Sequence, residues 1–503
     1  MNNYKLIILL VTLTLISCKA TELDLDEEKS AGNFPVNAAK PLSDTSYNNL
    51  TVEQQYQVAN KIASTVYKGV PVADFFDFRA YGNTFTVGEG KDFLSKFRQK
   101  LNTKEKNKAG FALLIDQRYS FNERRKPVAE PLATIREYPI SRDMFEAWMA
   151  YKLANTILFS PAEEIDSADY IDVQRIYTGL VKAMSEDVSI RDIIYTHMTS
   201  QANWRRFRSP EDNTREMIEI YLGLFDRDDD VPKASIACKN WYITDGDGNY
   251  ERVIDTLNEN TEPQFVLDQW VTTCEDFYRV VANHSLVIPR VTTFLVDHFF
   301  PNYSVEKRLA LTKDIVATDP QRFHDIFLAI IFSEEYLLYN EKSKSFEETF
   351  FNLAERTQWV HRSGFLNDLT NPSSGSPTMH KMMQPAMSLK LGRFKDQPLD
   401  SQSFANYHSA VRERLLTRSN NDWGSWGGNF VRQGDFFDQD DFVDFLFMSV
   451  VSRKSTEEER TELKSVFIST DNESDREDQT RIVFDYISRL PELYYSNAIV
   501  GGQ

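Results

Sequence analysis

The sequence predicts an all-α protein, with a large multi-helical body that contains at most a minor β-hairpin and is preceded by a flexible tether. Apolar residues recur three and four positions apart over most of the chain, as in the stripe formed by Met144, Trp148, Tyr151, Ala154 and Leu158. Sequences typical of helix N-termini precede many of these stretches. Alternating strand patterns are few and short, and no tandem repeat of fixed period indicates a regular solenoid.

Capping side chains mark where several helices begin, because they accept hydrogen bonds from backbone N–H groups that the first turn leaves unpaired. Thr51–Gln54 and Ser455–Glu458 have the spacing of capping boxes. Ser160-Pro161, Ser209-Pro210 and Asp319-Pro320 each put a capping residue before a proline that suits the first helical turn.

The body is expected to form two helical domains, over residues 50–340 and 341–503, divided after a helix by the polar stretch 340–345. Strand patterns at residues 110–117 and 240–254 predict a small hairpin. The predicted helices cover residues 52–68, 91–101, 142–159, 170–186, 188–202, 210–225, 230–241, 264–283, 288–300, 304–317, 320–339, 345–361, 403–418, 440–452, 455–467 and 476–489.

Composition excludes some classes of protein. Of the 503 residues, 41% are apolar and 26% are charged, which excludes disorder of the whole chain. Asp and Glu number 75 against 57 Lys and Arg, so the net charge is −18. Because phosphates must be met by Lys and Arg, nucleic acid is not an expected partner.

The N-terminus has the pattern of a bacterial lipoprotein signal peptide over residues 1–17. Lys5 precedes an apolar stretch that is too short to span a bilayer, which needs about 20 residues in a helix. Leu15-Ile16-Ser17-Cys18 resembles a lipobox, which implies cleavage before Cys18 and lipid attachment to its thiol. An ordinary signal peptide with a chance cysteine is the alternative.

Lipidation at Cys18 predicts a protein anchored in the cell envelope, with the membrane as its first partner. Lys19 follows the cysteine, which under the enterobacterial sorting rule favours the outer membrane, facing the periplasm or the exterior. Residues 18–49 are polar, acidic and without a helical apolar period, so they are expected to form a tether.

Two cysteines, Cys238 and Cys274, remain after lipidation. In an oxidising compartment they could pair and close a loop of about 37 residues, which stabilises by at most ~4 kcal/mol in the chain-entropy model. The alternative is two buried thiols that pack as small hydrophobic groups.

Two stretches resemble the bacterial family catalogued as domain of unknown function 1800. Residues 211–249 are similar to one of its helical segments, and residues 288–337 to its late helices, which end here in Ser333–Tyr336. The resemblance covers about a third of the chain and implies an exported helical protein without an established activity. The residues that match the first segment are Arg215, Glu216, Glu219, Gly223, Val231 and Trp241.

Arg215 and Glu219 lie four apart on one helix face and can pair, while Glu216 points to a neighbouring face. A structural polar clamp between helices is the favoured interpretation, because buried ion pairs can fix register. A carboxylate site is the alternative.

Two segments suggest metals, although no cofactor is expected. Met379, His380, Met383 and Met387 combine thioethers with an imidazole, a set that suits copper, and the alternative is a methionine-lined core face. Asp245, Asp247 and Asn249 begin like a calcium loop. Tyr250 and Thr256 stand where such a loop needs Gly and Glu, so a simple turn is the alternative.

Trp423 and Trp426 lie in a Gly-rich segment and could present aromatic faces to a glycan or a partner protein. Their alternative role is to close the edge of the helical core.

The catalytic motifs HExxH and GxSxG and the Walker loop are absent from the sequence. The leading hypothesis is therefore a non-catalytic envelope interaction or assembly protein with a protein or glycan partner. An enzyme or binding protein acting on polysaccharide or peptidoglycan is the alternative, and a periplasmic copper or calcium protein is a third hypothesis.

Overall fold

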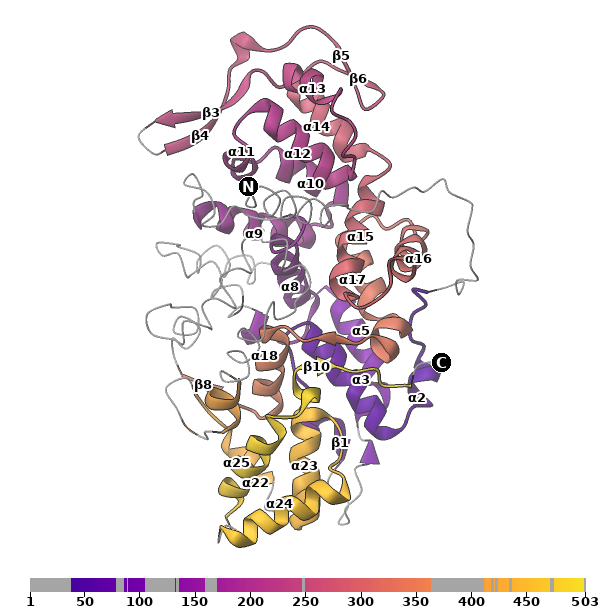
Figure 1. The fold of residues 1–503 in the computed structure, drawn as a ribbon, viewed down its shortest axis with the longest axis vertical. Helices are drawn as coiled ribbons and strands as arrows, with labels where there is room; N and C mark the ends of the chain where they lie inside the picture. Colours follow the sequence, from indigo (N-terminus) through magenta and orange to yellow (C-terminus); the bar gives the residue numbers. More distant parts are fainter. Residues whose placement is uncertain are drawn as a thin grey trace, which may run out of the picture. The chain divides into compact units, whose positions relative to one another are not determined.

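Helices make up most of the chain in the computed structural model, and the strands form short antiparallel pairs, which confirms the predicted all-α class (Figure 1). The signal peptide and Cys18 lie outside the described residues. The described residues are 38–77, 86–87, 89–104, 132, 135–158, 170–246, 249–362, 411–417, 420, 424–433, 437–470 and 475–501.

The chain forms two compact units, a smaller one of residues Ile194–Val291 and a larger one of Asn37–Ile193 and Thr292–Gln503. The predicted division after residue 340 falls inside the larger unit and is corrected. Asn340 and Lys342 are buried, and Lys61 Nζ donates a hydrogen bond to the carbonyl oxygen of Asn340 at 2.7 Å. The polar stretch is thus part of a core and not a linker.

The larger unit begins earlier than expected, because the last part of the predicted tether is folded. Leu42 and Tyr47 are buried, and the Tyr47 hydroxyl donates to the carbonyl oxygen of Gly90 at 3.1 Å. Up to residue 193, this unit contains α2 (Asp44–Asn48), α3 (Val52–Thr65), α4 (Val72–Phe75), β1 (Phe76–Asp77), β2 (Thr86–Val87), the 3₁₀ helix η1 (Glu89–Asp92), α5 (Phe93–Asn102), α8 (Arg142–Ala154), α9 (Tyr170–Ser185) and the start of α10 (Ile190–Met198).

The second part of the larger unit brings the C-terminal helices α23, α24 and α25 together, in yellow in Figure 1. It contains the end of α15 (Val287–Phe299), α16 (Val305–Val316), α17 (Phe323–Ile331), the π-helix η3 (Glu335–Tyr339), β7 (Lys342–Ser343), α18 (Phe346–Arg356), β8 (Val360–His361), the π-helix η6 (Arg412–Leu416), β9 (Gly424–Ser425), α22 (Gly428–Gln433), α23 (Gln439–Val451), α24 (Glu457–Ser469), α25 (Arg476–Ile487), the 3₁₀ helix η8 (Pro491–Leu493) and β10 (Tyr495–Ser496).

The core of the larger unit is built around α8 and α3. Every residue of α8 is buried, and its Trp148 stacks on Phe145 with ring centres 5.3 Å apart and meets Phe327 edge-on at 5.2 Å. Helix α3 packs against α18 and η3. The short pairs β1–β2, β7–β10 and β8–β9 join separate segments of this helical body.

The smaller unit combines helices with two hairpins. The predicted hairpin over residues 240–254 is present as β3–β4, in which Trp241 pairs with Ile254. The smaller unit contains the end of α10, α11 (Gln201–Arg206), α12 (Pro210–Leu222), α13 (Val231–Ala237), β3 (Trp241–Gly246), β4 (Asn249–Ile254), the 3₁₀ helix η2 (Thr256–Asn258), β5 (Gln264–Val266), β6 (Gln269–Val271), α14 (Cys274–Asn283) and the start of α15.

Among the described residues, capping patterns located two helix starts correctly and two incorrectly, and Ser160-Pro161 lies outside the described residues. Thr51 forms the predicted capping box with Gln54, and the Ser209 hydroxyl accepts from the third residue of its helix. The second capping box is shifted by one residue and starts at Thr456, because Ser455 donates to buried Asp444 instead. Asp319 adopts φ 52°, and α17 starts after Arg322.

The described helices include none that is long and apolar enough to cross a membrane.

Replacing Thr456 by alanine removes the hydroxyl that accepts the Glu459 N–H at 3.2 Å, so the free energy of unfolding should fall by about 1 kcal/mol. The urea unfolding midpoint measures this change. Thr461→Ala is the matched control, because its hydroxyl bonds within the exposed part of the same helix. Equal losses for both variants would contradict the assigned cap.

Candidate functional site

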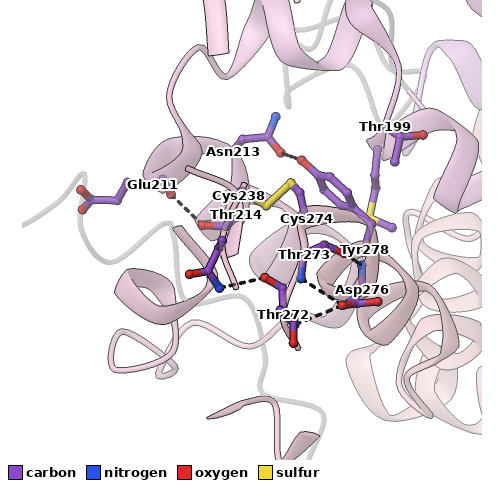
Figure 2. The surroundings of a disulfide bond; sticks show 12 residues. Thr199, Glu211, Asn213, Thr214, Cys238, Thr272, Thr273, Cys274, Asp276 and Tyr278 are labelled. Atoms are coloured by element: carbon purple, nitrogen blue, oxygen red, sulfur yellow. Dashed lines mark hydrogen bonds between the residues drawn. A yellow bond between two sulfur atoms is a disulfide. The ribbon is translucent and has the colours of Figure 1, made fainter. Parts of the chain in front are cut away.

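A disulfide joins Cys238 and Cys274 in the smaller unit, with their Cα atoms 4.2 Å apart (Figure 2). Cys238 is the C-cap residue of α13, and Cys274 is the first residue of α14. Both side chains are fully buried. Because both hairpins of this unit lie between the two cysteines, the disulfide closes the loop that carries them.

Hydrogen bonds around the disulfide fix the start of α14. The Asp276 carboxylate accepts the N–H groups of Thr272 and Thr273, and the Thr273 hydroxyl accepts the Asp276 N–H (Figure 2). Burial raises the pKa of Asp276, but these hydrogen bonds outweigh burial and hold the pKa below its usual value. One turn later, the buried Tyr278 hydroxyl donates to Asn213 Oδ1 on α12 at 2.7 Å. This network links the loop to two helices.

The β5–β6 hairpin presents a pair of aromatic rings to solvent. Phe265 and Trp270 are cross-strand partners with ring centres 5.2 Å apart, and they are 43% and 70% exposed. Val266 and Val271 on the same strands are buried, and the strands contact α13 and α14. Aromatic side chains, tryptophan among them, are enriched at protein interfaces, so this exposed pair is a candidate binding surface.

The turn of this hairpin has an unfavourable backbone. Leu267 and Asp268 have φ values of 52° and 61°, in the left-handed region that residues with a Cβ atom rarely adopt. Each such conformation costs on the order of 1–3 kcal/mol of free energy. Burial of Leu267 offsets part of that cost, and Asp268 lies 3.4 Å from Arg227 in an ion pair. The surrounding structure therefore holds the aromatic pair in place.

Sequence analysis missed this hairpin, because residues 264–283 were expected to form one helix. Only α14 from Cys274 onward is helical. The repeated pattern Gln-Phe-Val and Gln-Trp-Val on either side of Leu267-Asp268 is the signal that indicates two paired strands. The absence of glycine from the turn obscured it.

The predicted polar clamp at Arg215 is corrected. Arg215 donates to Asp228 at 2.5 Å and lies 3.7 Å from Glu211, and its side chain is 37% exposed. The negative charge of Glu219 acts on Arg215, but these two side chains do not form the predicted ion pair. Burial raises the pKa of Glu216. Arg215 therefore links its helix to the surface loop that contains Asp228. Exposed ion pairs of this kind stabilise a fold only weakly.

Trp426 does not form the exposed binding face that the sequence suggested. Its ring is buried against Phe484, with centres 5.3 Å apart, and its Nε1 donates to the carbonyl oxygen of Leu415 at 2.7 Å. A side chain at Gly424 would overlap the Trp359 ring, so close packing explains this glycine. Trp423 lies outside the described residues.

The segments suggested as metal sites are described only in part. Met379, His380, Met383 and Met387 lie outside the described residues, as does Asp247. Asp245 and Asn249 belong to the antiparallel strands β3 and β4, in which Asp245 pairs with Tyr250 and Gly246 pairs with Asn249. Within the described part of the chain, no three His, Cys, Asp or Glu side chains gather closely enough to hold a metal ion.

Two buried histidines in the described part of the chain, His197 and His324, have surroundings that indicate a structural role. Burial lowers the pKa of His197 to about 4, so its imidazole stays neutral at pH 7 beside the Tyr221 ring. His324 Nε2 lies 3.1 Å from the carbonyl oxygen of Leu101, to which it can donate.

No family model, curated protein or solved structure matches the chain. The resemblance to domain of unknown function 1800 therefore remains a prediction, and the candidate site depends on the geometry of the smaller unit.

The disulfide yields a direct prediction. Peptides containing Cys238 and Cys274 should be linked in protein isolated without reductant, as measured by mass spectrometry. The Cys238→Ser/Cys274→Ser variant should lose up to about 4 kcal/mol of stability in the smaller unit, and reductant should then have no further effect. Two free thiols in the native protein would contradict the bond.

Proposed function

We propose that the protein is a lipid-anchored envelope protein that binds a partner protein through the Phe265–Trp270 pair. The observation that carries this proposal is the exposed aromatic pair on a hairpin whose loop is closed by a disulfide. Disulfides persist in oxidising compartments, in agreement with the signal peptide that the sequence predicts over residues 1–17. The proposed function is therefore binding to a partner protein.

The surroundings of the aromatic pair favour a partner with a basic rim. Glu259, Glu262 and Asp268 are exposed beside or on the hairpin. Aromatic residues supply most binding energy at the centre of an interface, while charges around them select the partner and speed association. A partner with an apolar pocket surrounded by lysine and arginine would complement this surface.

The interaction predicts a site-specific crosslink. A photo-crosslinking phenylalanine analogue at position 270 should join the chain to one protein in intact cells, whereas the analogue at Tyr242, on the other hairpin, should not. Phe265→Ala in the chain labelled at position 270 should reduce the product at least about fivefold. Equal products from both positions, a glycan product, or no product at position 270 would contradict the proposal.

Lipid attachment is tested separately. Cys18→Ser should abolish incorporation of a labelled fatty acid and release the protein from the membrane fraction, because no other lipid-bearing residue is proposed. Position 18 lies far in sequence from the smaller unit, so the disulfide should still form. Retention of the variant through a diacyl anchor would overturn the lipidation site and leave the aromatic surface untouched.

A further inference from the structure

A cavity of about 300 Å³ lies in the larger unit, between α3, α18, the end of α23 and the C-terminal segment. This volume is at the lower limit of sites that bind small molecules. Exposed Tyr495 and Asn497 lie at its edge, while Asn60, Lys61 and Arg356 are buried, so the cavity extends from solvent into the core. Most of its lining side chains are polar.

Cations dominate the charge of this cavity. Lys61, Lys344, Arg356 and Arg453 line it, and Glu492 is the one carboxylate among the described residues that do so. This excess contrasts with the net charge of −18 on the whole chain. Of the four cations, Arg453 is paired with Glu459 at 2.8 Å and lies 3.3 Å from Glu492.

Lys61 is the most informative of these groups. Its ammonium donates to the carbonyl oxygens of Asn340 at 2.7 Å and Asn497 at 3.2 Å. An ammonium has three N–H donors, so one donor remains for a ligand. Among the described residues, no carboxylate forms an ion pair with Lys61, although burying a cation without a counter-charge is costly.

Backbone carbonyl oxygens also accept hydrogen bonds from two neighbouring cations, Lys344 and Arg356. Lys344 Nζ donates to the carbonyl oxygens of Glu492 at 3.0 Å and Leu493 at 3.2 Å. The Arg356 guanidinium donates to the carbonyl oxygens of Met448 and Val450 at the end of α23. The guanidinium also donates to side-chain oxygens of Asn352 and Ser452.

The cavity wall also includes strained backbone. Ser452, which caps the end of α23, has a φ of 62°. Non-glycine residues adopt this conformation only where the surrounding structure enforces it, and such residues concentrate at binding sites. Here the hydrogen bond from Arg356 to the Ser452 hydroxyl, at 2.8 Å, holds the turn.

We propose that this cavity is a binding site for a small anion whose charge resides on carboxylate, phosphate or sulfate oxygens, held by Lys61 and Lys344. Such a ligand supplies the counter-charge that Lys61 lacks and accepts its remaining N–H. Lysine ammonium groups act as point charges and do not distinguish these oxyanions by geometry. The site is independent of the aromatic surface on the smaller unit.

Binding at this site should depend on pH. Burial, with the nearby charge of Lys342 and Lys344, lowers the pKa of Lys61 to about 7, and burial with the charge of Arg356 lowers the pKa of Lys344 to about 7. Each lysine carries its charge below that pH and needs to take up a proton to bind an anion above it. Affinity should therefore be highest near pH 6 and fall as pH rises.

Three carboxylates and one further lysine also act on the charges of Lys61 and Lys344. Glu341 acts on Lys61, and Glu348 and Glu492 act on Lys344. Lys342 acts on both lysines and is itself paired with Glu348 at 2.7 Å. No histidine is among the described residues that line the cavity.

Calorimetric titration of the full-length protein with sulfate tests the proposal, because sulfate keeps its charge between pH 6 and pH 9. Sulfate should bind at least about tenfold more tightly at pH 6 than at pH 9. At pH 8, titrations in two buffers of different ionisation enthalpy should show proton uptake. Glucuronate should behave in the same way if a carboxylate suffices, while a response to sulfate alone restricts the ligand to tetrahedral oxyanions. Neutral glucose should not bind.

Lys61→Met and Lys344→Met should each weaken sulfate binding at pH 6 at least about tenfold. Lys454→Met is the matched control, since it removes the same charge from an exposed position outside the cavity lining and should leave affinity within about twofold. If one cavity variant does not fold, the other variant and the proton uptake of the unmodified protein still test the anion site. No binding at pH 6, binding without proton uptake, or an equal loss in the control would overturn the proposal.

Discussion

The larger unit depends on helix α3, which is buried on almost every side although many of its buried side chains are polar. Each of these polar groups needs a partner inside the core. Asn60 Oδ1 accepts the N–H of Val70 at 3.1 Å, and the Thr65 hydroxyl lies 2.7 Å from that of Tyr336. Lys61 binds the segments around residues 340 and 497. One helix thus holds together parts of the chain that are hundreds of residues apart.

This arrangement connects the fold to a binding site. Carbonyl oxygens satisfy hydrogen-bond donors but supply no full negative charge, so the buried ammonium of Lys61 has no ion-pair partner among the described residues. Burying Lys61 without an ion-pair partner lowers the stability of the fold, and an anion in the cavity would restore part of it. Attraction of an anion is local, because the chain as a whole is acidic.

Local patterns predicted much of the fold, and long-range contacts account for the errors. The helix starts at Thr51 and Ser209 follow from side-chain chemistry within four residues. The cavity was invisible in the sequence, because Lys61 and Lys344 are 283 positions apart and each resembles an ordinary surface lysine. Trp426 was misassigned since its Gly-rich segment is typical of a loop, whereas packing against Phe484 buries it. The β5–β6 hairpin escaped notice because its turn lacks glycine.

Anomalous diffraction from crystals of the full-length protein soaked in selenate at pH 6 tests the central claim, that the buried cations around α3 form an anion site. Selenate has the shape and charge of sulfate, and its selenium marks its position. The account predicts an anomalous peak inside the cavity, with selenate oxygens at about 3 Å from the Nζ atoms of Lys61 and Lys344. An empty cavity, with selenate bound only to exposed lysines, would contradict it.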